Sequence, residues 1–277
     1  MSPVPDRQAT GTSPPPIVMI HGMWSRPDVW ENFIPYFERI GFAVEAPALR
    51  HHELRAGEAP AELGRVSLID YADDLEAIIR RSGRLPVLFG HSMGGLIAQR
   101  LASRGLARAV VLLAPAAPPG FAVLRPEAIR IFHRLFLRRR FWSRPQRLGQ
   151  REAAHGLFHR LAPAERDRRI GAMAADSGRA LFEIALPWLD RRRAALIDIA
   201  RVRCPLLILA GAQDRIMPAA GGRRLASRYG GQARYVELPT HAHWLLGEPG
   251  WQNIAEICAE WLAAALPDAA VLAEMRS

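Results

Sequence analysis

The sequence predicts an α/β protein whose central sheet of about six strands is mostly parallel and flanked by helices. Short apolar segments of strand length alternate along the chain with longer segments in which apolar residues recur at helical spacing. Such alternation produces a parallel sheet that helices cover on both faces. The predicted strands are apolar almost throughout, as expected of strands that are buried on both sides.

The first half of the chain contains four of the predicted strands, at residues 17–20, 42–46, 87–89 and 109–113. Helices are predicted between them where apolar side chains return every three or four positions, at residues 28–39, 68–81 and 94–103. In the first of these helices, Trp30, Phe33 and Phe37 share one stripe. The elements therefore alternate in the order that a doubly covered sheet requires.

The second half completes the sheet after a long insertion. Two further strands are predicted at residues 206–209 and 234–238, and two helices at residues 219–229 and 250–265. The insertion follows a proline-rich run and shows several helical patterns but no convincing strand. An insertion at the edge where strands end lies over the active face of the sheet. We therefore interpret residues 118–199 as a helical cap on a core formed by residues 16–117 and 200–277.

Residues 1–15 are rich in proline, serine and threonine and predict a disordered leader. They contain no apolar stretch after a basic start, so they do not resemble a secretory signal. No apolar run in the chain reaches the roughly 18 residues that a membrane span needs. We therefore expect a cytoplasmic protein.

Two cysteines, Cys204 and Cys258, lie in apolar surroundings and belong to no CxxC or Cys/His cluster. A structural zinc site needs such clustered ligands, so we expect no metal site. We favour their interpretation as small buried hydrophobic side chains. A disulfide between them is the alternative, although it would be unusual in the cytosol.

The net charge of +10 comes entirely from arginine, because the chain has no lysine. Residues 120–195 hold 17 arginines against 7 acidic residues, so the excess charge lies in the predicted cap. No nucleic-acid-binding module accompanies them, and nucleic acid is not an expected partner. We favour a solvated arginine-rich face, and the alternative is an anionic substrate or a weak contact with an anionic membrane surface.

The most informative segment is Gly90-His91-Ser92-Met93-Gly94, which joins a predicted strand to a predicted helix. Serine is a weak nucleophile unless its side chain is exposed near a base, and a tight strand-to-helix turn supplies that exposure. The turn needs glycine on both sides because it leaves no room for side chains there. It also places Ser92 at a helix N-terminus, where N–H groups and the helix dipole favour negative charge.

Backbone N–H groups can stabilise the negative oxygen that forms when a serine attacks an acyl carbon. We expect one donor from Met93, directly after the nucleophile, and another from the loop His21-Gly22-Met23-Trp24 after the first strand. Met23 is the favoured donor and Trp24 is the alternative. Gly22 lets the loop approach closely, and His21 is expected to order the loop.

A catalytic serine also requires a general base and an acid that orients this base, and both follow the serine along the chain in this arrangement. Two candidate bases, His241 and His243, stand together after the last predicted strand. Asp214 is the favoured acid because it directly follows the strand at residues 206–209. Three other acids are alternatives for the residue that orients the base: Asp176 and Asp190, which lie in the predicted cap, and Glu237, which lies within a strand pattern.

Together these segments resemble the α/β-hydrolase superfamily in its cap-bearing, esterase/lipase-like branch. The resemblance covers residues 16–115 and 200–266, and its matching segments lie at residues 21–22, 90–95, 211–214 and 243–244. It implies the α/β-hydrolase fold and places His243 in register with the catalytic histidine, so His241 is expected at the entrance. A serine nucleophile separates the chain from dehalogenases and epoxide hydrolases, whose similar turns carry aspartate. The pair His51-His52 has no assigned role beyond a loop near the pocket.

These residues predict a serine hydrolase that cleaves a carboxylic ester, thioester or lactone of a hydrophobic small molecule through an acyl-enzyme, with no cofactor. The apolar side chains of the predicted cap favour a hydrophobic substrate. Substrate contacts are expected from Trp24, His91, His241 and Trp244. Two alternatives remain open. One is a lyase, cyclase or C–C hydrolase with the same triad, and the other is a ligand receptor with little turnover.

Overall fold

The computed structural model describes residues 14–53, 58–121 and 126–267, and its core is a six-stranded sheet. The strands are β1 (Ile17–Ile20), β2 (Val44–Glu45), β3 (Val87–His91), β4 (Ala109–Leu113), β7 (Leu206–Gly211) and β8 (Ala233–Leu238). They lie in the order β2-β1-β3-β4-β7-β8, and every neighbouring pair is parallel. The predicted α/β fold is confirmed, and each predicted strand is present.

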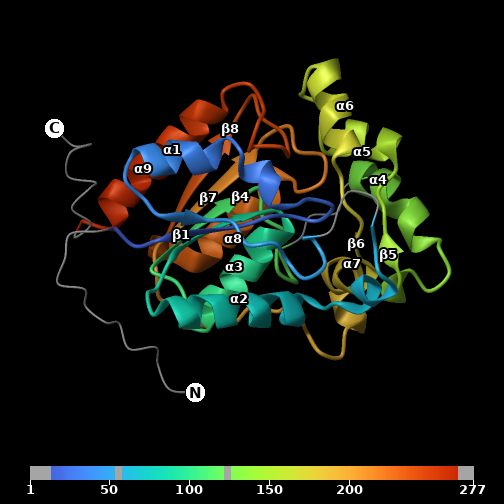
Figure 1. Ribbon diagram of the computed structural model, residues 1–277, viewed down its shortest axis with the longest axis horizontal. Coiled ribbons are helices and arrows are strands. Elements are labelled where there is room, and N and C mark those ends of the chain that lie inside the picture. The colour runs from blue at the N-terminus through green and yellow to red at the C-terminus, as the bar shows by residue number, and fades with distance from the viewer. Residues whose placement is uncertain (1–13, 54–57, 122–125, 268–277) are drawn as a thin grey trace.

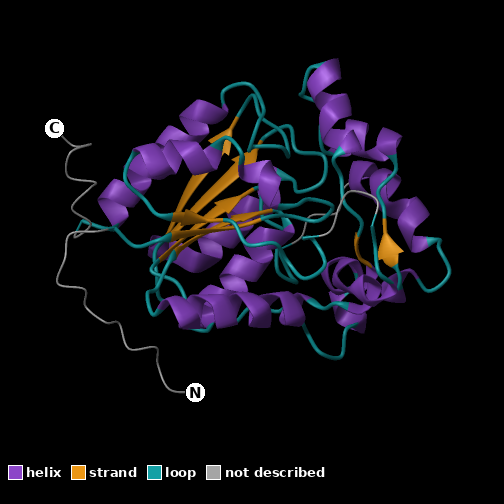
Figure 2. Cartoon of the chain, viewed as in Figure 1, coloured by secondary structure: helices purple, strands orange, loops and turns teal. Residues whose placement is uncertain are grey.

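Helices cover both faces of this sheet (Figures 1 and 2). One face carries α1 (Phe33–Arg39) and α9 (Trp251–Ala265), and the other carries α2 (Leu68–Ser82), α3 (Met93–Ser103) and α8 (Ala219–Tyr229). Successive strand residues point to opposite faces. In β3, Val87 and Phe89 therefore pack with α1 and α9, whereas Leu88 packs with the helices of the other face.

Two predicted elements are shorter than the sequence pattern indicated. The segment at residues 28–39 is split into a 3-10 turn, Pro27–Trp30, and α1. Pro35 lacks the N–H that a helix interior needs, and the later start places it in the first turn, where no such donor is needed. Strand β2 has only two residues, because it lies at the sheet edge and Pro47 stands two residues beyond its end.

The cap, defined here as residues 118–199, lies to one side of the sheet between β4 and β7 (Figure 1). Its longer helices are α4 (Pro126–Phe136), α5 (Gln150–Gly156), α6 (Pro163–Gly171) and α7 (Gly178–Ala185). It also contains two short strands, β5 (Pro145–Gln146) and β6 (Asp176–Ser177), which pair antiparallel. The expectation that this segment forms no strand is therefore wrong, because two-residue strands are too short to produce a detectable alternation.

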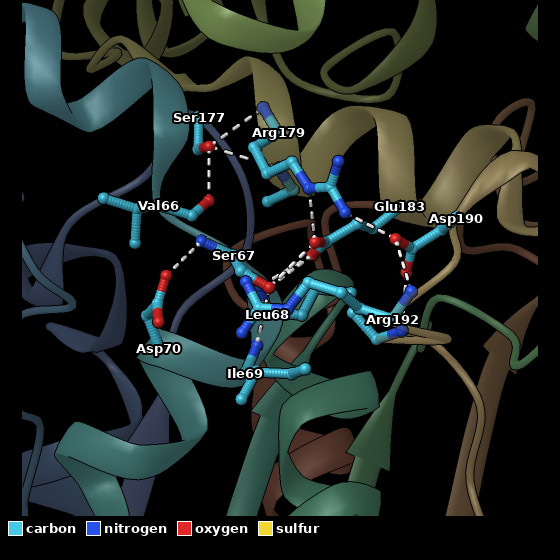
Figure 3. A network of polar contacts seen from close by, with 12 residues as sticks. Val66, Ser67, Leu68, Ile69, Asp70, Ser177, Arg179, Glu183, Asp190 and Arg192 are labelled. Carbon is cyan, nitrogen blue, oxygen red and sulfur yellow. Dashed lines mark hydrogen bonds and ion pairs between the residues drawn. The ribbon is translucent and has the colours of Figure 1, made fainter.

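A buried polar network joins the cap to helix α2 (Figure 3). The Glu183 carboxylate accepts hydrogen bonds from Ser67 Oγ at 2.8 Å and from the Leu68 N–H at 2.8 Å. A carboxylate at this point satisfies free N–H groups of the helix and meets the positive end of its dipole. Arg179 Nε donates to Glu183 at 2.7 Å, and the same guanidinium also contacts Asp190. The cap is thus anchored to α2 through Glu183, and one guanidinium, that of Arg179, lies between the carboxylates of Glu183 and Asp190.

Nearly all of the predicted leader, residues 1–15, lies outside the described residues. No helix in the part of the chain that the structure describes is both long and apolar enough to span a lipid bilayer. Cys204 and Cys258 are both free thiols, so the alternative of a disulfide between them is not realised.

Candidate active site

Ser92 occupies the sharp turn between β3 and α3, with φ of 53° and ψ of −119°. A non-glycine residue with positive φ is strained, and such strain is held in place only by well-packed surroundings. Here the backbones are so close that a Cβ on Gly94 would lie 2.1 Å from the carbonyl oxygen of Ile20. A Cβ on Gly90 would lie 2.5 Å from the carbonyl oxygen of Gly94. The two glycines therefore permit the turn that presents Ser92.

The histidine and aspartate predicted as partners lie against each other. His243 Nδ1 is 2.7 Å from Asp214 Oδ2, and both side chains are buried. The other oxygen of Asp214 accepts the N–H groups of Ile216 and Met217, at 2.7 Å and 2.8 Å. The aspartate is thereby fixed from both sides. Because Nδ1 faces a carboxylate, it carries the hydrogen, and Nε2 is left with a lone pair to accept a proton.

Ser92, His243, Met23 and Met93 all line one cavity, although they come from three different segments, which follow β1, β3 and β8. The N–H groups of Met23 and Met93 make no hydrogen bond within the described loops, and Met93 is the first residue of α3. Trp24, the alternative donor, instead gives its N–H to Asp176 at 2.8 Å. The geometry therefore favours Met23 over Trp24 as the oxyanion donor.

The predicted substrate-contact residues divide into two groups. Trp24, His91 and Trp244 line the cavity, but His241 does not lie among its described lining residues. His241 is buried, with Nδ1 3.3 Å from Thr240 Oγ1, so its expected place at the entrance is not realised. His243 therefore lines the cavity, whereas His241 is buried outside its described lining.

His91 is a support as well as a lining residue. Its Nε2 donates a hydrogen bond to the backbone carbonyl oxygen of His243 at 2.9 Å. Complete burial, with the nearby His243 ring, lowers the pKa of His91 to about 3, so the imidazole stays neutral at physiological pH. Its ring packs edge-on against Trp244, with centroids 5.6 Å apart.

Sequence reasoning missed a carboxylate that holds the histidine loop. Glu248 is buried and accepts the N–H of Ala242 at 2.8 Å and the N–H of Trp244 at 3.0 Å, which are the residues on either side of His243. The sequence signal for this role is an acidic residue directly after the apolar run that follows His243, because a carboxylate in apolar surroundings needs hydrogen-bond donors close by.

The cavity has a volume of about 830 Å³ and is mainly apolar. The core contributes the polar atoms near Ser92, and the cap contributes a wall of large apolar side chains, among them Phe132, Phe136, Phe158, Leu181, Ile184 and Trp188. Arg193 is the only Arg, Lys, Asp or Glu side chain among the described residues that line it. Within the same described residues, no cluster of histidine, cysteine and acidic side chains could hold a metal ion.

A family model described as the α/β hydrolase family matches residues 17–256 of the chain. The protein belongs to the α/β-hydrolase family. This membership confirms the resemblance expected from residues 90–95 and their partners, and it accounts for the parallel sheet with an insertion between β4 and β7.

Individual members of this family are similar to the chain in sequence or in fold. A pyrethroid hydrolase from Sphingobium wenxiniae is 32% identical over 82 residues, a segment that covers 28% of this chain and about a quarter (27%) of that relative. The structure of a monoacylglycerol lipase from Paleococcus ferrophilus has a TM-score of 0.66 and 22% identity, covering 91% of this chain and 97% of the lipase. The structure of a pyrethroid hydrolase from Sphingobium faniae has a TM-score of 0.65 and 21% identity, covering 92% of this chain and 99% of that hydrolase. These structural likenesses concern the fold.

Proposed function

We propose that this α/β hydrolase is a serine esterase that cleaves carboxylic esters of uncharged, bulky hydrophobic molecules. The observation that carries the proposal is the position of Ser92. Ser92 stands on a strained turn and lines the same cavity as His243. The Nδ1 atom of His243 is hydrogen-bonded to Asp214. A nucleophile, a base and a residue that orients the base are the three groups that acyl transfer needs.

In the proposed reaction, His243 Nε2 removes the proton of Ser92 Oγ as this oxygen attacks the ester carbonyl carbon. The N–H groups of Met23 and Met93 stabilise the oxyanion, and Asp214 stabilises the imidazolium that forms. His243 then gives its proton to the leaving alcohol, and an acyl-enzyme remains. Water, activated by the same histidine, attacks the acyl-enzyme and releases the acid.

The substrate class follows from the cavity. Its apolar walls remove water from hydrophobic groups, and a charged group placed there would lose its hydration without a partner. The relatives named above are called pyrethroid hydrolase and monoacylglycerol lipase, and both names refer to esters of hydrophobic molecules. These names support an ester with a long acyl chain or a bulky apolar alcohol, ahead of a thioester or lactone.

The test is hydrolysis of a p-nitrophenyl ester series from acetate to palmitate by the native chain and Ser92→Ala. We expect activity on medium or long chains that falls at least 10³-fold in Ser92→Ala, as is usual when a nucleophile is removed. Ser227→Ala is the matched control, because Ser227 is an exposed serine of α8 that is not among the described lining residues of the cavity. Equal activity of Ser92→Ala and the native chain would disprove the assignment. Activity without accumulation of a carboxylic acid would indicate lyase chemistry instead.

A further inference from the structure

The backbone of Trp24 is held in an unusual conformation by the cap. Its φ is 59°, in the left-handed region that large side chains rarely adopt. Its N–H donates to Asp176 Oδ2 at 2.8 Å, and its carbonyl oxygen accepts the N–H of Ala174 at 2.9 Å. Its indole Nε1 donates to the carbonyl oxygen of Gln146 at 3.2 Å. All three partners belong to the cap, although Trp24 belongs to the core loop after β1.

This conformation bears directly on the neighbouring residue, Met23. The bond from the Trp24 N–H to Asp176 holds the peptide plane between Met23 and Trp24, and the peptide that carries the Met23 N–H joins this plane at the Met23 Cα. The Met23 N–H is the proposed oxyanion donor, and such a donor works only within a few tenths of an ångström of its position. The cap therefore reaches the oxyanion loop through the Asp176 carboxylate, in addition to the backbone groups of Ala174 and Gln146.

Asp176 is wholly buried and fully used as an acceptor. In addition to Trp24, its oxygens accept from the Ser177 N–H at 2.6 Å, from His52 Nε2 at 3.1 Å and from Tyr71 Oη at 3.3 Å. A buried carboxylate with several donors and a nearby positive charge can remain ionised. Burial alone would raise the pKa of Asp176, but His52 and these hydrogen bonds hold it below its ordinary value.

The hydrogen-bond partners of His52 favour a charged ring. Nε2 faces the Asp176 carboxylate, and Nδ1 lies 3.1 Å from the carbonyl oxygen of Arg50. Both partners can only accept, so both ring nitrogens carry hydrogen and the imidazole is protonated. Burial, the largest single effect, lowers the pKa of His52, but the charge and hydrogen bond of Asp176, together with backbone hydrogen bonds, keep this pKa above the ordinary value.

The other titratable groups around His52 do not replace this charge. The His21 ring lies 5.0 Å from the His52 ring, and burial lowers its pKa to about 3. His21 is neutral because Nδ1 donates to the Gly22 carbonyl oxygen while Nε2 accepts the Leu49 N–H. Tyr71 faces the ring edge-on at 5.9 Å, and its pKa is raised well above 10, first by burial. Arg26, Asp28 and Glu53 lie with His52 around a small surface pocket.

We propose that Asp176, charged and paired with a protonated His52, is the positioning residue through which the cap sets the oxyanion-hole loop. The inference rests on the proposed esterase function. Asp176 touches no reacting atom, and it acts through the Trp24 amide on the neighbouring Met23. Removal of its charge should therefore slow the chemical step more than it weakens substrate binding.

The first experiment compares Asp176→Asn with Glu183→Gln. Both replace a buried carboxylate that joins the cap to the core, but Glu183 contacts the N-terminus of α2 and not the oxyanion loop. We expect Asp176→Asn to lower kcat at least 30-fold with KM within about threefold, as for a displaced oxyanion donor. Glu183→Gln should lower thermal stability but leave kcat within about threefold. Equal effects of both variants on kcat would reduce Asp176 to a general cap anchor and overturn the proposal.

A second measurement does not depend on turnover. An alkylboronic acid forms a tetrahedral adduct with an activated serine and places an oxygen in the oxyanion hole, whereas the corresponding alkyl alcohol binds only the apolar cavity. Asp176→Asn should weaken boronic acid binding at least tenfold and leave alcohol binding unchanged. If the native chain binds the boronic acid but cleaves no ester, the esterase proposal fails while the positioning role is still tested. Unchanged boronic acid binding in Asp176→Asn would overturn the positioning role.

The protonation of the His52 ring can be measured separately, by NMR and by the pH dependence of kcat. In 15N NMR spectra of the native chain at neutral pH, both His52 ring nitrogens should carry hydrogen, and one unprotonated nitrogen would contradict the charged pair. A raised pKa means that His52 loses its proton on the alkaline side, so kcat should decline there. His52→Gln keeps a donor toward Asp176 but cannot titrate, so this decline should disappear. An unchanged alkaline decline in that variant would show that His52 is not its source.

Discussion

His91, the last residue of β3, donates a hydrogen bond from Nε2 to the backbone carbonyl oxygen of His243 at 2.9 Å. The residue directly before the nucleophile thus supports the residue proposed as its base. Glu248 binds the N–H groups of the residues on either side of His243, so the loop is held at three successive positions. The base and the nucleophile are therefore placed relative to each other by backbone contacts.

The support from His91 can be tested by substitution. His91→Ala removes the donor to the His243 carbonyl and should lower kcat roughly tenfold or more, because small displacements of a catalytic base are costly. His91→Gln keeps an N–H donor and should retain more activity than the alanine variant. The measurement is ester turnover, with the exposed His133→Ala as control. Equal losses in the alanine and glutamine variants would contradict a role for the hydrogen bond.

Buried neutral histidines should make the fold sensitive to acid. Burial lowers the pKa of both His21 and His91 to about 3, whereas in the unfolded chain each has the ordinary value near 6.5. Between pH 6.5 and about pH 3, these histidines bind protons in the unfolded state but not in the folded state, so the free energy of unfolding decreases as pH falls. Each histidine contributes a slope of up to about 1.4 kcal/mol per pH unit in that window. Urea unfolding at pH 7 and pH 5 should show a smaller loss for His91→Gln than for the native chain.

The sequence predicted the parts of the fold that depend on local pattern. Most core strands lie in segments that are apolar almost throughout, and the Gly90–Gly94 turn was recognisable because its tight geometry leaves few choices of residue. Asp214 could be located because the carboxyl ends of parallel strands meet at one edge, and His243 was chosen over His241 by the resemblance of its segment to the α/β-hydrolase superfamily. Their 2.7 Å contact joins residues that are 29 positions apart.

The contacts between the cap and the core could not be predicted in the same way. Asp176 and Trp24 are separated by 152 positions, and no periodicity indicates that a cap carboxylate will meet a loop amide. The sequence indicates for Asp176 only a place among the possible triad acids, and for His52 only a loop near the pocket. The side-chain direction of His241 was also mispredicted, because a loop has no regular alternation from which to infer it.

The apolar cavity predicts control of chain length by Leu181, a buried α7 residue that lines it. Leu181→Phe fills space and should shift the preferred acyl chain to shorter esters, whereas Leu181→Ala should shift it to longer ones. The p-nitrophenyl ester series measures both shifts as ratios of kcat/KM. Leu137→Ala, at a position 80% exposed and away from the described lining, should leave the profile unchanged. The same optimum in all three variants would place the acyl chain elsewhere.

The anchor between Glu183 and helix α2 predicts a large effect on stability. Glu183→Ala removes one of the two buried carboxylates that Arg179 contacts, and it removes the acceptor for the Leu68 N–H. Breaking a buried pair from one side typically costs about 3 kcal/mol or more. Chemical denaturation should show this loss, whereas Glu260→Ala on the exposed side of α9 should change stability by less than about 0.5 kcal/mol. A small effect at Glu183 would mean that the cap is held mainly by its apolar contacts.

The arginine-rich rim of the cap predicts weak binding to anionic membranes. Trp188 lines the cavity yet is 70% exposed, Leu189 is 58% exposed, and the arginines at 191–193 are exposed with no side-chain ion pair among the described residues. Apolar and cationic side chains side by side suit an anionic lipid surface, at about 1 kcal/mol per arginine. Vesicles with anionic lipid should therefore bind the native chain more tightly than neutral vesicles.

Two triple variants test whether this binding is local. Replacing the arginines at 191–193 with glutamine should remove most of the difference between the two kinds of vesicle. Replacing the exposed arginines 223, 224 and 228 of α8 with glutamine changes the net charge equally and should leave the difference in place. Equal effects of the two triple variants would indicate net charge alone and no docking face.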